Sequence, residues 1–116
     1  MALHSELRIY KPAYDLLSLT MDYVRNIPRD MKIVLGSSMR DKCLAILDLI
    51  ARANAATDKR PHLTQLIETN DSLAVLFRIL SDKRFINPGQ HAKAMRLTIS
   101  LGRQANGWRN SLCHTA

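Results

Sequence analysis

Apolar residues recur along the chain at steps of three and four positions, in four runs separated by short polar stretches. This spacing puts the apolar side chains of each run on one face of a helix. Strict alternation of apolar and polar residues, which would indicate strands, is absent over any useful length. The pattern therefore predicts four amphipathic helices. Their core stripes are Ala13, Leu16, Thr20, Val24 and Ile27; Leu35, Met39, Cys43, Ile46, Ile50 and Ala53; Leu63, Leu66, Asn70, Leu73, Phe77 and Leu80; and Ala94, Leu97, Leu101, Ala105, Trp108 and Leu112.

The four prolines mark where these runs begin and end. Pro12, Pro61 and Pro88 each stand near the beginning of a run, where the missing N–H of proline costs nothing. Asn87 precedes Pro88 and is a good N-cap residue. Pro28 follows the first run and ends it.

The links between the predicted helices are short, roughly residues 27–31, 56–60 and 83–87. Short links join helices that lie antiparallel beside one another. We therefore expect an all-α protein, an antiparallel up-down-up-down four-helix bundle that forms a single domain over residues 1–116.

Three residues fit the helical stripes less simply. Gly36 and Gly102 stand inside helical runs, where glycine costs about 1 kcal/mol relative to alanine. Either residue indicates a close approach between helices, and for Gly36 a late helix start is the alternative. Asn70 stands on a core stripe, either as a buried amide with its hydrogen bonds satisfied or as a residue that sets helix register.

Several helices carry more apolar residues than one stripe needs. The excess has to be buried in a wider core or between subunits, so the pattern predicts a homo-oligomer. These additional residues are Leu17, Met21, Leu44, Leu47, Met95 and Ile99.

Composition places the chain among ordinary globular proteins, with 47% hydrophobic and 23% charged residues. No apolar stretch approaches the length of about 20 residues that spans a membrane, and no signal peptide is recognisable. Two cysteines, Cys43 and Cys113, do not make a disulfide framework. We interpret them as reduced thiols and expect a cytoplasmic protein without a membrane partner.

Charge is the first positive indication of function. Seventeen basic residues against ten acidic residues give a net charge of +7. The excess is concentrated at the end, since residues 87–116 contain four basic residues and no acidic residue. A basic surface of this kind favours a polyanionic partner, although solubility alone is a simpler explanation.

The last run carries a polar stripe opposite its apolar stripe, with three cations and no anion. Arginine can hold phosphates bidentately, so the stripe is a candidate track for a nucleic-acid backbone, and a solvated helix face is the alternative. No aromatic platform accompanies it, so binding is expected to be tolerant of sequence. The candidate residues for binding nucleic acid or a reverse transcriptase are Lys93, Arg96 and Arg103 on this stripe, and Arg29, Lys32 and Arg40 around the second run.

No motif for catalysis or for a bound cofactor is recognisable. The four histidines show no pairing at helical spacing, and neither Glu6 nor Glu68 belongs to a Glu-x-x-His pair. A phosphate-binding glycine loop and a Ser-His-acid grouping are also missing from the sequence. We expect a protein without catalytic residues, metal or cofactor.

Several short motifs, most of them containing proline or glycine, resemble those of one family in their residues and spacing. Ile27-Pro28-Arg29, Leu35-Gly36, the Leu44/Leu47/Asp48 run, and Gly102-Arg103 followed by Gly107-Trp108 resemble the accessory variability determinant of diversity-generating retroelements. The similarity spans roughly residues 10 to 111. Asn106 departs from the glycine expected before Gly107.

The resemblance implies a non-enzymatic homopentamer that assists a reverse transcriptase. Such a protein engages the transcriptase and the template RNA or cDNA through a basic surface and supports mutagenic cDNA synthesis. Arg29 and Arg103 match the positions of the family's motifs. Two other functions remain open, a stand-alone nucleic-acid-binding bundle and a purely structural oligomer.

Overall fold

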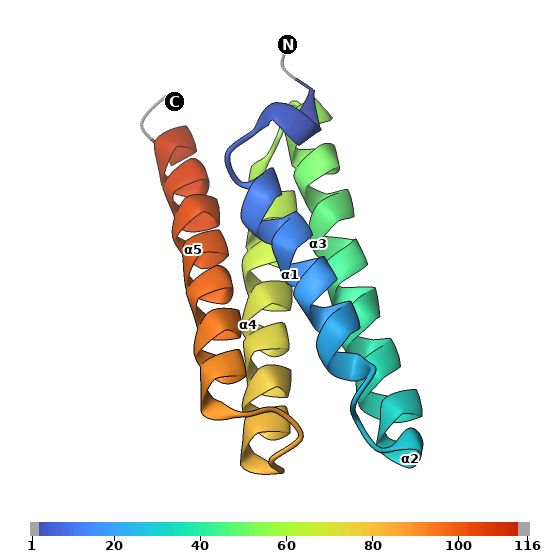
Figure 1. The fold of residues 1–116 in the computed structure, drawn as a ribbon. Coiled ribbons are helices and arrows are strands. Elements are labelled where there is room, and N and C mark those ends of the chain that lie inside the picture. Colours follow the sequence, from blue (N-terminus) through green and yellow to red (C-terminus); the bar gives the residue numbers. More distant parts are fainter. Residues whose placement is uncertain (1–2, 114–116) are drawn as a thin grey trace.

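The computed structural model describes residues 3–113, and the side chains of residues 3–112. Four long helices form the molecule: α1 (Tyr10–Val24), α3 (Ser37–Ala55), α4 (Arg60–Asp82) and α5 (Pro88–Cys113) (Figure 1). Three short elements complete it, a 3-10 turn η1 (His4–Glu6), a single turn α2 (Arg29–Met31) and a π-helical turn η2 (Lys32–Gly36). No strand occurs within residues 3–113. The all-helical prediction is confirmed.

The long helices surround one core. Each packs against two neighbours, α1 against α3, α3 against α4, α4 against α5, and α5 against α1. The molecule is a rod of 48 × 21 × 21 Å. The beginning of η1 and the end of α5 lie at the same end of this rod (Figure 1). Over the part of the chain described, none of the helices has the length and apolar content required to cross a bilayer.

The first three predicted core stripes are buried at every position. The fourth is different. Its centre is formed by Ala94, Thr98, Leu101 and Ala105, while Leu97, Trp108 and Leu112 are only partly buried. The sequence interpretation placed Leu97 on this stripe in place of Thr98. The hydroxyl of Thr98 donates a hydrogen bond to the Met95 carbonyl at 3.1 Å, so it can lie in the core with its donor satisfied.

Asn70 links α4 to α5. Its side-chain Nδ2 donates to the main-chain oxygen of Thr98 at 2.9 Å, and Asn70 is 3% exposed. A Cβ atom on Gly102 would lie 3.4 Å from that nitrogen, an ordinary van der Waals contact, so α4 and α5 lie close together here without requiring glycine. The amide is half satisfied, because its Oδ1 is buried without a hydrogen-bond partner among the described residues.

Gly36 also marks a close approach. A Cβ atom there would lie 2.6 Å from Cγ1 of Val24, the last residue of α1. The alternative of a late helix start is wrong, because helical structure already begins at Arg29 and continues through η2 into α3. The π-helical turn at Lys32–Gly36 was not predicted.

Candidate nucleic-acid and partner interface

The beginning of α5 is fixed by its own sequence and by α1. The Gln90 N–H donates to Oδ1 of Asn87 at 2.7 Å, and the Asn87 N–H donates to Oε1 of Gln90 at 2.8 Å. This reciprocal pair is a capping box, and it confirms Asn87 as the N-cap. The Tyr23 hydroxyl donates to the Gln90 carbonyl at 2.9 Å and so ties α1 to the first turn of α5.

Lys93, Arg96 and Arg103 are exposed on α5, and this helix contains no acidic residue. None of the three forms an ion pair with a carboxylate within residues 3–113. By contrast, Lys11, Arg25, Arg52 and Arg78 each pair with an aspartate three or four positions away. Lys93, Arg96 and Arg103 therefore keep their charge available for a partner.

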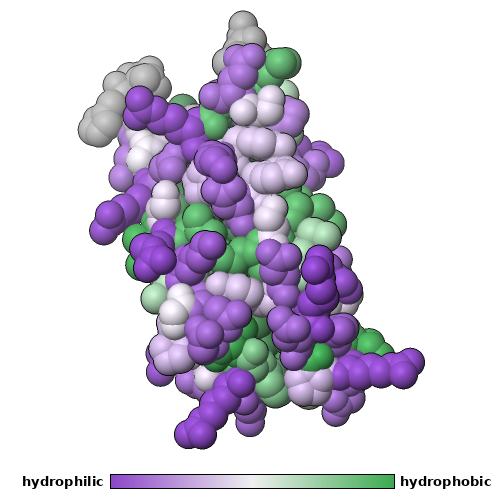
Figure 2. Space-filling view, in the orientation of Figure 1, coloured by the Kyte–Doolittle hydropathy of each residue, from purple (hydrophilic) through white to green (hydrophobic). Residues whose placement is uncertain are grey.

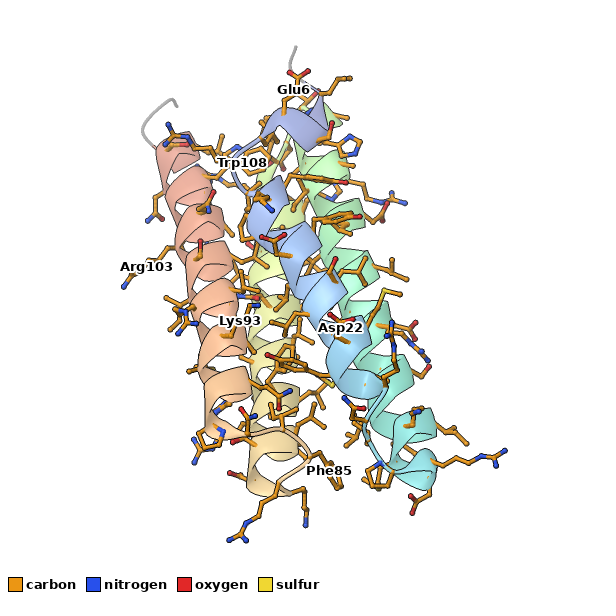
Figure 3. The ribbon with its side chains drawn as sticks, viewed as in Figure 1. Glu6, Asp22, Phe85, Lys93, Arg103 and Trp108 are labelled. Atoms are coloured by element: carbon orange, nitrogen blue, oxygen red, sulfur yellow. The ribbon has the colours of Figure 1, made fainter. Side chains whose placement is uncertain are left out.

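Lys93, Arg96 and Arg103 lie on two flanks of α5. Lys93 and Arg96 line a groove between α1 and α5, whereas Arg103 lines a shallower hollow beside α4. In Figure 3, Arg103 extends away from the bundle, while Lys93 lies on the side of α5 that faces α1. We call the surface formed by Lys93, Arg96 and Arg103 the α5 ridge. The groove between α1 and α5 lies on one side of this ridge.

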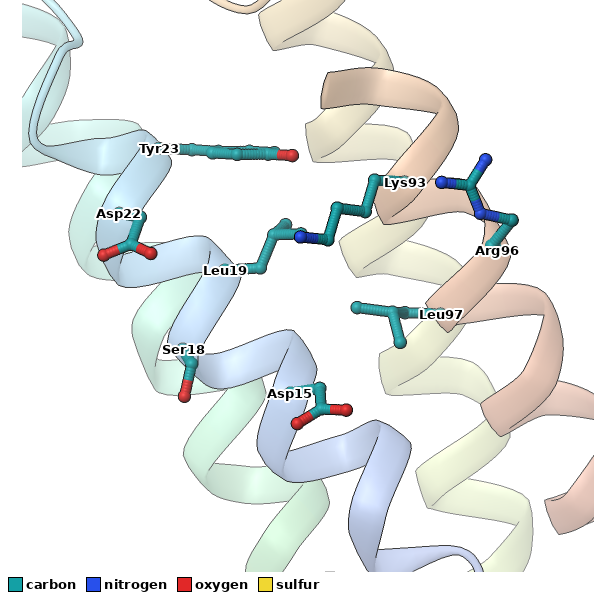
Figure 4. Close-up of a pocket in the computed structure, with 8 residues that line it drawn as sticks. All are labelled: Asp15, Ser18, Leu19, Asp22, Tyr23, Lys93, Arg96 and Leu97. Atoms are coloured by element: carbon teal, nitrogen blue, oxygen red, sulfur yellow. The ribbon is translucent and has the colours of Figure 1, made fainter. Parts of the chain in front are cut away.

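The groove between α1 and α5 has a volume of about 500 Å³. Asp15 and Asp22 stand on its α1 side, and Leu19 and Leu97 contribute apolar surface between the two helices. Lys93 reaches across the groove toward α1, and the Arg96 guanidinium stays beside α5 (Figure 4). The space-filling view shows apolar patches between hydrophilic rims in this region (Figure 2).

Opposite charges act on the hydroxyl of Tyr23 in this groove. Burial raises the pKa of Tyr23, the positive charge of Arg96 lowers that pKa, and the negative charge of Asp22 raises it. Charged residues on both sides of the groove, Arg96 and Asp22, therefore act on the Tyr23 hydroxyl between them.

Arg29, Lys32 and Arg40 lie elsewhere. They belong to α2, η2 and α3, and α3 stands diagonally across the bundle from α5, since both pack against α1 and α4. Arg29 and Arg40 are exposed. The Lys32 ammonium donates to the Arg25 carbonyl at 3.1 Å, so Lys32 closes the end of α1. The structure therefore separates the six candidate residues into two groups.

Sequence reasoning missed Lys83 and Arg84, which are exposed in the turn between α4 and α5. Their segment has a balanced charge in the sequence, so no local excess pointed to them. Arg84 has a φ angle of 62°, in the left-handed region that glycine usually occupies. The turn places a positively charged pair immediately before the acid-free α5.

A family model described as bAvd-like matches residues 7–112, most of the chain. The chain belongs to the bAvd-like family. This is the accessory variability determinant family of diversity-generating retroelements, so the resemblance stated from the sequence is confirmed. Searches of curated proteins and of solved structures gave no match.

Two further features of this bAvd-like chain limit its site chemistry. Within residues 3–113, no three histidine, cysteine or acidic side chains are grouped closely enough to hold a metal ion. Burial raises the pKa of the Cys43 thiol to about 11, and Cys43 is 1% exposed. On α1, the rings of Tyr10 and Tyr14 stack with their centroids 6.1 Å apart, and Tyr14 is 50% exposed. What the α5 ridge offers is unpaired positive charge.

Proposed function

We propose that this protein is a non-enzymatic accessory factor of a diversity-generating retroelement. In this function it binds the reverse transcriptase and the template RNA or cDNA through the α5 ridge and supports mutagenic cDNA synthesis. The observation that carries the proposal is that Lys93, Arg96 and Arg103, on an acid-free helix in a member of this family, form no ion pair with a carboxylate within residues 3–113. Such cations release counterions when they meet phosphates.

Assembly is part of the proposal. An antiparallel up-down-up-down bundle that forms a homo-oligomer, a pentamer by the family resemblance, would repeat the α5 ridge around a symmetry axis and multiply its field. Exposed apolar side chains on three helices support association, because large exposed apolar residues are candidates for burial between subunits. These include Met21 (49% exposed), Leu44 (54%) and Ile99 (47%).

The test replaces two ridge cations, as Arg96→Gln/Arg103→Gln. The matched control, Arg52→Gln/Arg78→Gln, removes the same charge from arginines paired with Asp48 and Asp82. For single-stranded RNA, we expect the ridge variant to reduce the slope of log binding constant against log salt by about 1.4, at about 0.7 per phosphate contact. Both variants should melt like the parent, because exposed substitutions usually change stability by less than about 0.5 kcal/mol.

The same proteins are then titrated with the reverse transcriptase of the retroelement. The ridge variant should bind the transcriptase more weakly than the control does. Equal RNA slopes and equal transcriptase binding in both variants would remove the ridge from the proposed function. RNA binding without transcriptase binding by the parent would favour a stand-alone nucleic-acid-binding bundle.

A further inference from the structure

The groove between α1 and α5 holds opposite charges that do not neutralise one another. Asp15 pairs with Lys11 at 2.9 Å and Asp22 with Arg25 at 3.8 Å, both along α1. Lys93 reaches toward these carboxylates from α5 (Figure 4), yet it forms no ion pair with a carboxylate within the described residues. The groove is therefore open between its acidic rim and its basic rim.

A phosphate backbone is a poor occupant of this groove. Each phosphate that approached Lys93 would also approach Asp15 and Asp22, and like charges repel. A polyanion meets fewer carboxylates at Arg103, whose hollow is lined by one acidic residue, Asp71, whereas the groove is lined by two. The groove and the ridge are thus suited to different partners.

A helix fits the groove better. Grooves between two helices take an amphipathic helix that inserts apolar side chains, and the flanking charges then set its orientation. Leu19 and Leu97 supply apolar surface, and the volume of about 500 Å³ has room for inserted side chains. An enclosed site for a small molecule would be lined mainly by apolar residues, whereas four of the eight residues here carry a charge.

We propose that the α1–α5 groove binds an amphipathic helix of the reverse transcriptase, with basic residues beside Asp15 and Asp22 and an acidic residue beside Lys93. This inference rests on the proposed function and deepens it, because it adds to the ridge a groove for the transcriptase, with Lys93 and Arg96 belonging to both. Both rims of the groove contribute to binding, so removing either rim weakens the complex with the transcriptase.

The experiment uses the full chain with two groove variants, Asp15→Asn/Asp22→Asn and Lys93→Gln. The matched control for the first is Asp48→Asn/Asp82→Asn, which also removes two carboxylates paired along their own helices, with Arg52 and Arg78. Binding to the transcriptase and to poly(U) RNA is measured for each protein, and thermal melting confirms that each is folded.

We expect both groove variants to bind the transcriptase about tenfold more weakly than the parent, and the aspartate variant about tenfold more weakly than its control. Binding of poly(U) by the aspartate variant should match its control. If RNA occupied the groove, Asp15→Asn/Asp22→Asn would instead tighten poly(U) binding beyond the control, and that result would overturn the inference.

Two other results are decisive. Transcriptase binding that is unchanged in the groove variants, with a parent that binds, would overturn the inference and leave the proposed function standing. A parent that binds poly(U) but not the transcriptase would overturn the inference together with the transcriptase part of the proposed function.

Discussion

Arg84 occupies a backbone position that usually belongs to glycine. It follows the last turn of α4, where the Phe85 N–H donates to the Leu80 carbonyl at 2.9 Å and the Arg84 N–H donates to the Ser81 carbonyl at 3.0 Å. These two bonds form a Schellman motif, which places its C′ residue at positive φ. The observed φ of 62° carries a cost in an arginine that glycine would avoid.

Replacing Arg84 with glycine should therefore stabilise the protein, by about 0.5–1 kcal/mol. Arg84→Ala separates this effect from the loss of charge, because alanine keeps the Cβ atom and the strain. We expect alanine to give no such gain in chemical denaturation. If Arg84→Ala stabilised the fold as much as Arg84→Gly, the cause would be charge and not backbone conformation.

At the scale of elements, the packing of η2 against α1 depends on the absence of one side chain. A Cβ atom on Gly36 would lie 2.6 Å from Cγ1 of Val24, a β-branched residue that is 2% exposed and has little freedom to move. Gly107 stands in α5 with no such neighbour within 4 Å. Two glycines in helical turns thus have opposite surroundings.

The same substitution should have opposite effects at these two positions. Gly36→Ala should destabilise the protein by about 1–3 kcal/mol, because it overpacks the contact with Val24. Gly107→Ala should stabilise it by up to about 1 kcal/mol, because alanine favours the helix and meets open space. Urea denaturation of both variants measures the two signs. A stabilised Gly36→Ala would show that η2 can move away from α1.

At the scale of the whole molecule, large aromatic residues differ in their place along the rod. Phe77 is fully buried in the core, and its ring meets that of Tyr23 edge to face with the ring centroids 6.2 Å apart. Trp108 is half-buried, and with Leu7 and Ile9 it lines a hollow where the N-terminal segment meets α5. The sequence interpretation of Trp108 as a core anchor therefore needs correction. Trp108 packs against the edge of the core.

Phe77→Ala should lower the free energy of unfolding by about 3–5 kcal/mol, as truncation of a buried large aromatic residue does. Trp108→Ala should cost less, because part of its ring already meets solvent and less buried contact is lost. Denaturation followed by circular dichroism compares the two variants without relying on the single tryptophan. An equal loss in the free energy of unfolding for both variants would show that Trp108 contributes as much as a fully buried core residue.

Much of this molecule can be predicted from its sequence. The first three core stripes lie where the steps of three and four residues put them, because burial of an apolar stripe is what stabilises each amphipathic helix. The Asn87 cap follows from a local rule of helix termini. The absence of acidic residues around the cations of α5 can also be read directly from the sequence.

Only the tertiary structure decided how these helices face one another. The core position of Thr98, the flanking place of Leu97 and the contact between Gly36 and Val24 depend on the rotation and approach of neighbouring helices. The groove depends on them too, because Asp15 and Lys93 are 78 positions apart and meet only when α1 packs beside α5. Helical periodicity fixes the direction of a side chain on its own helix, and the packing of four helices fixes what that side chain meets.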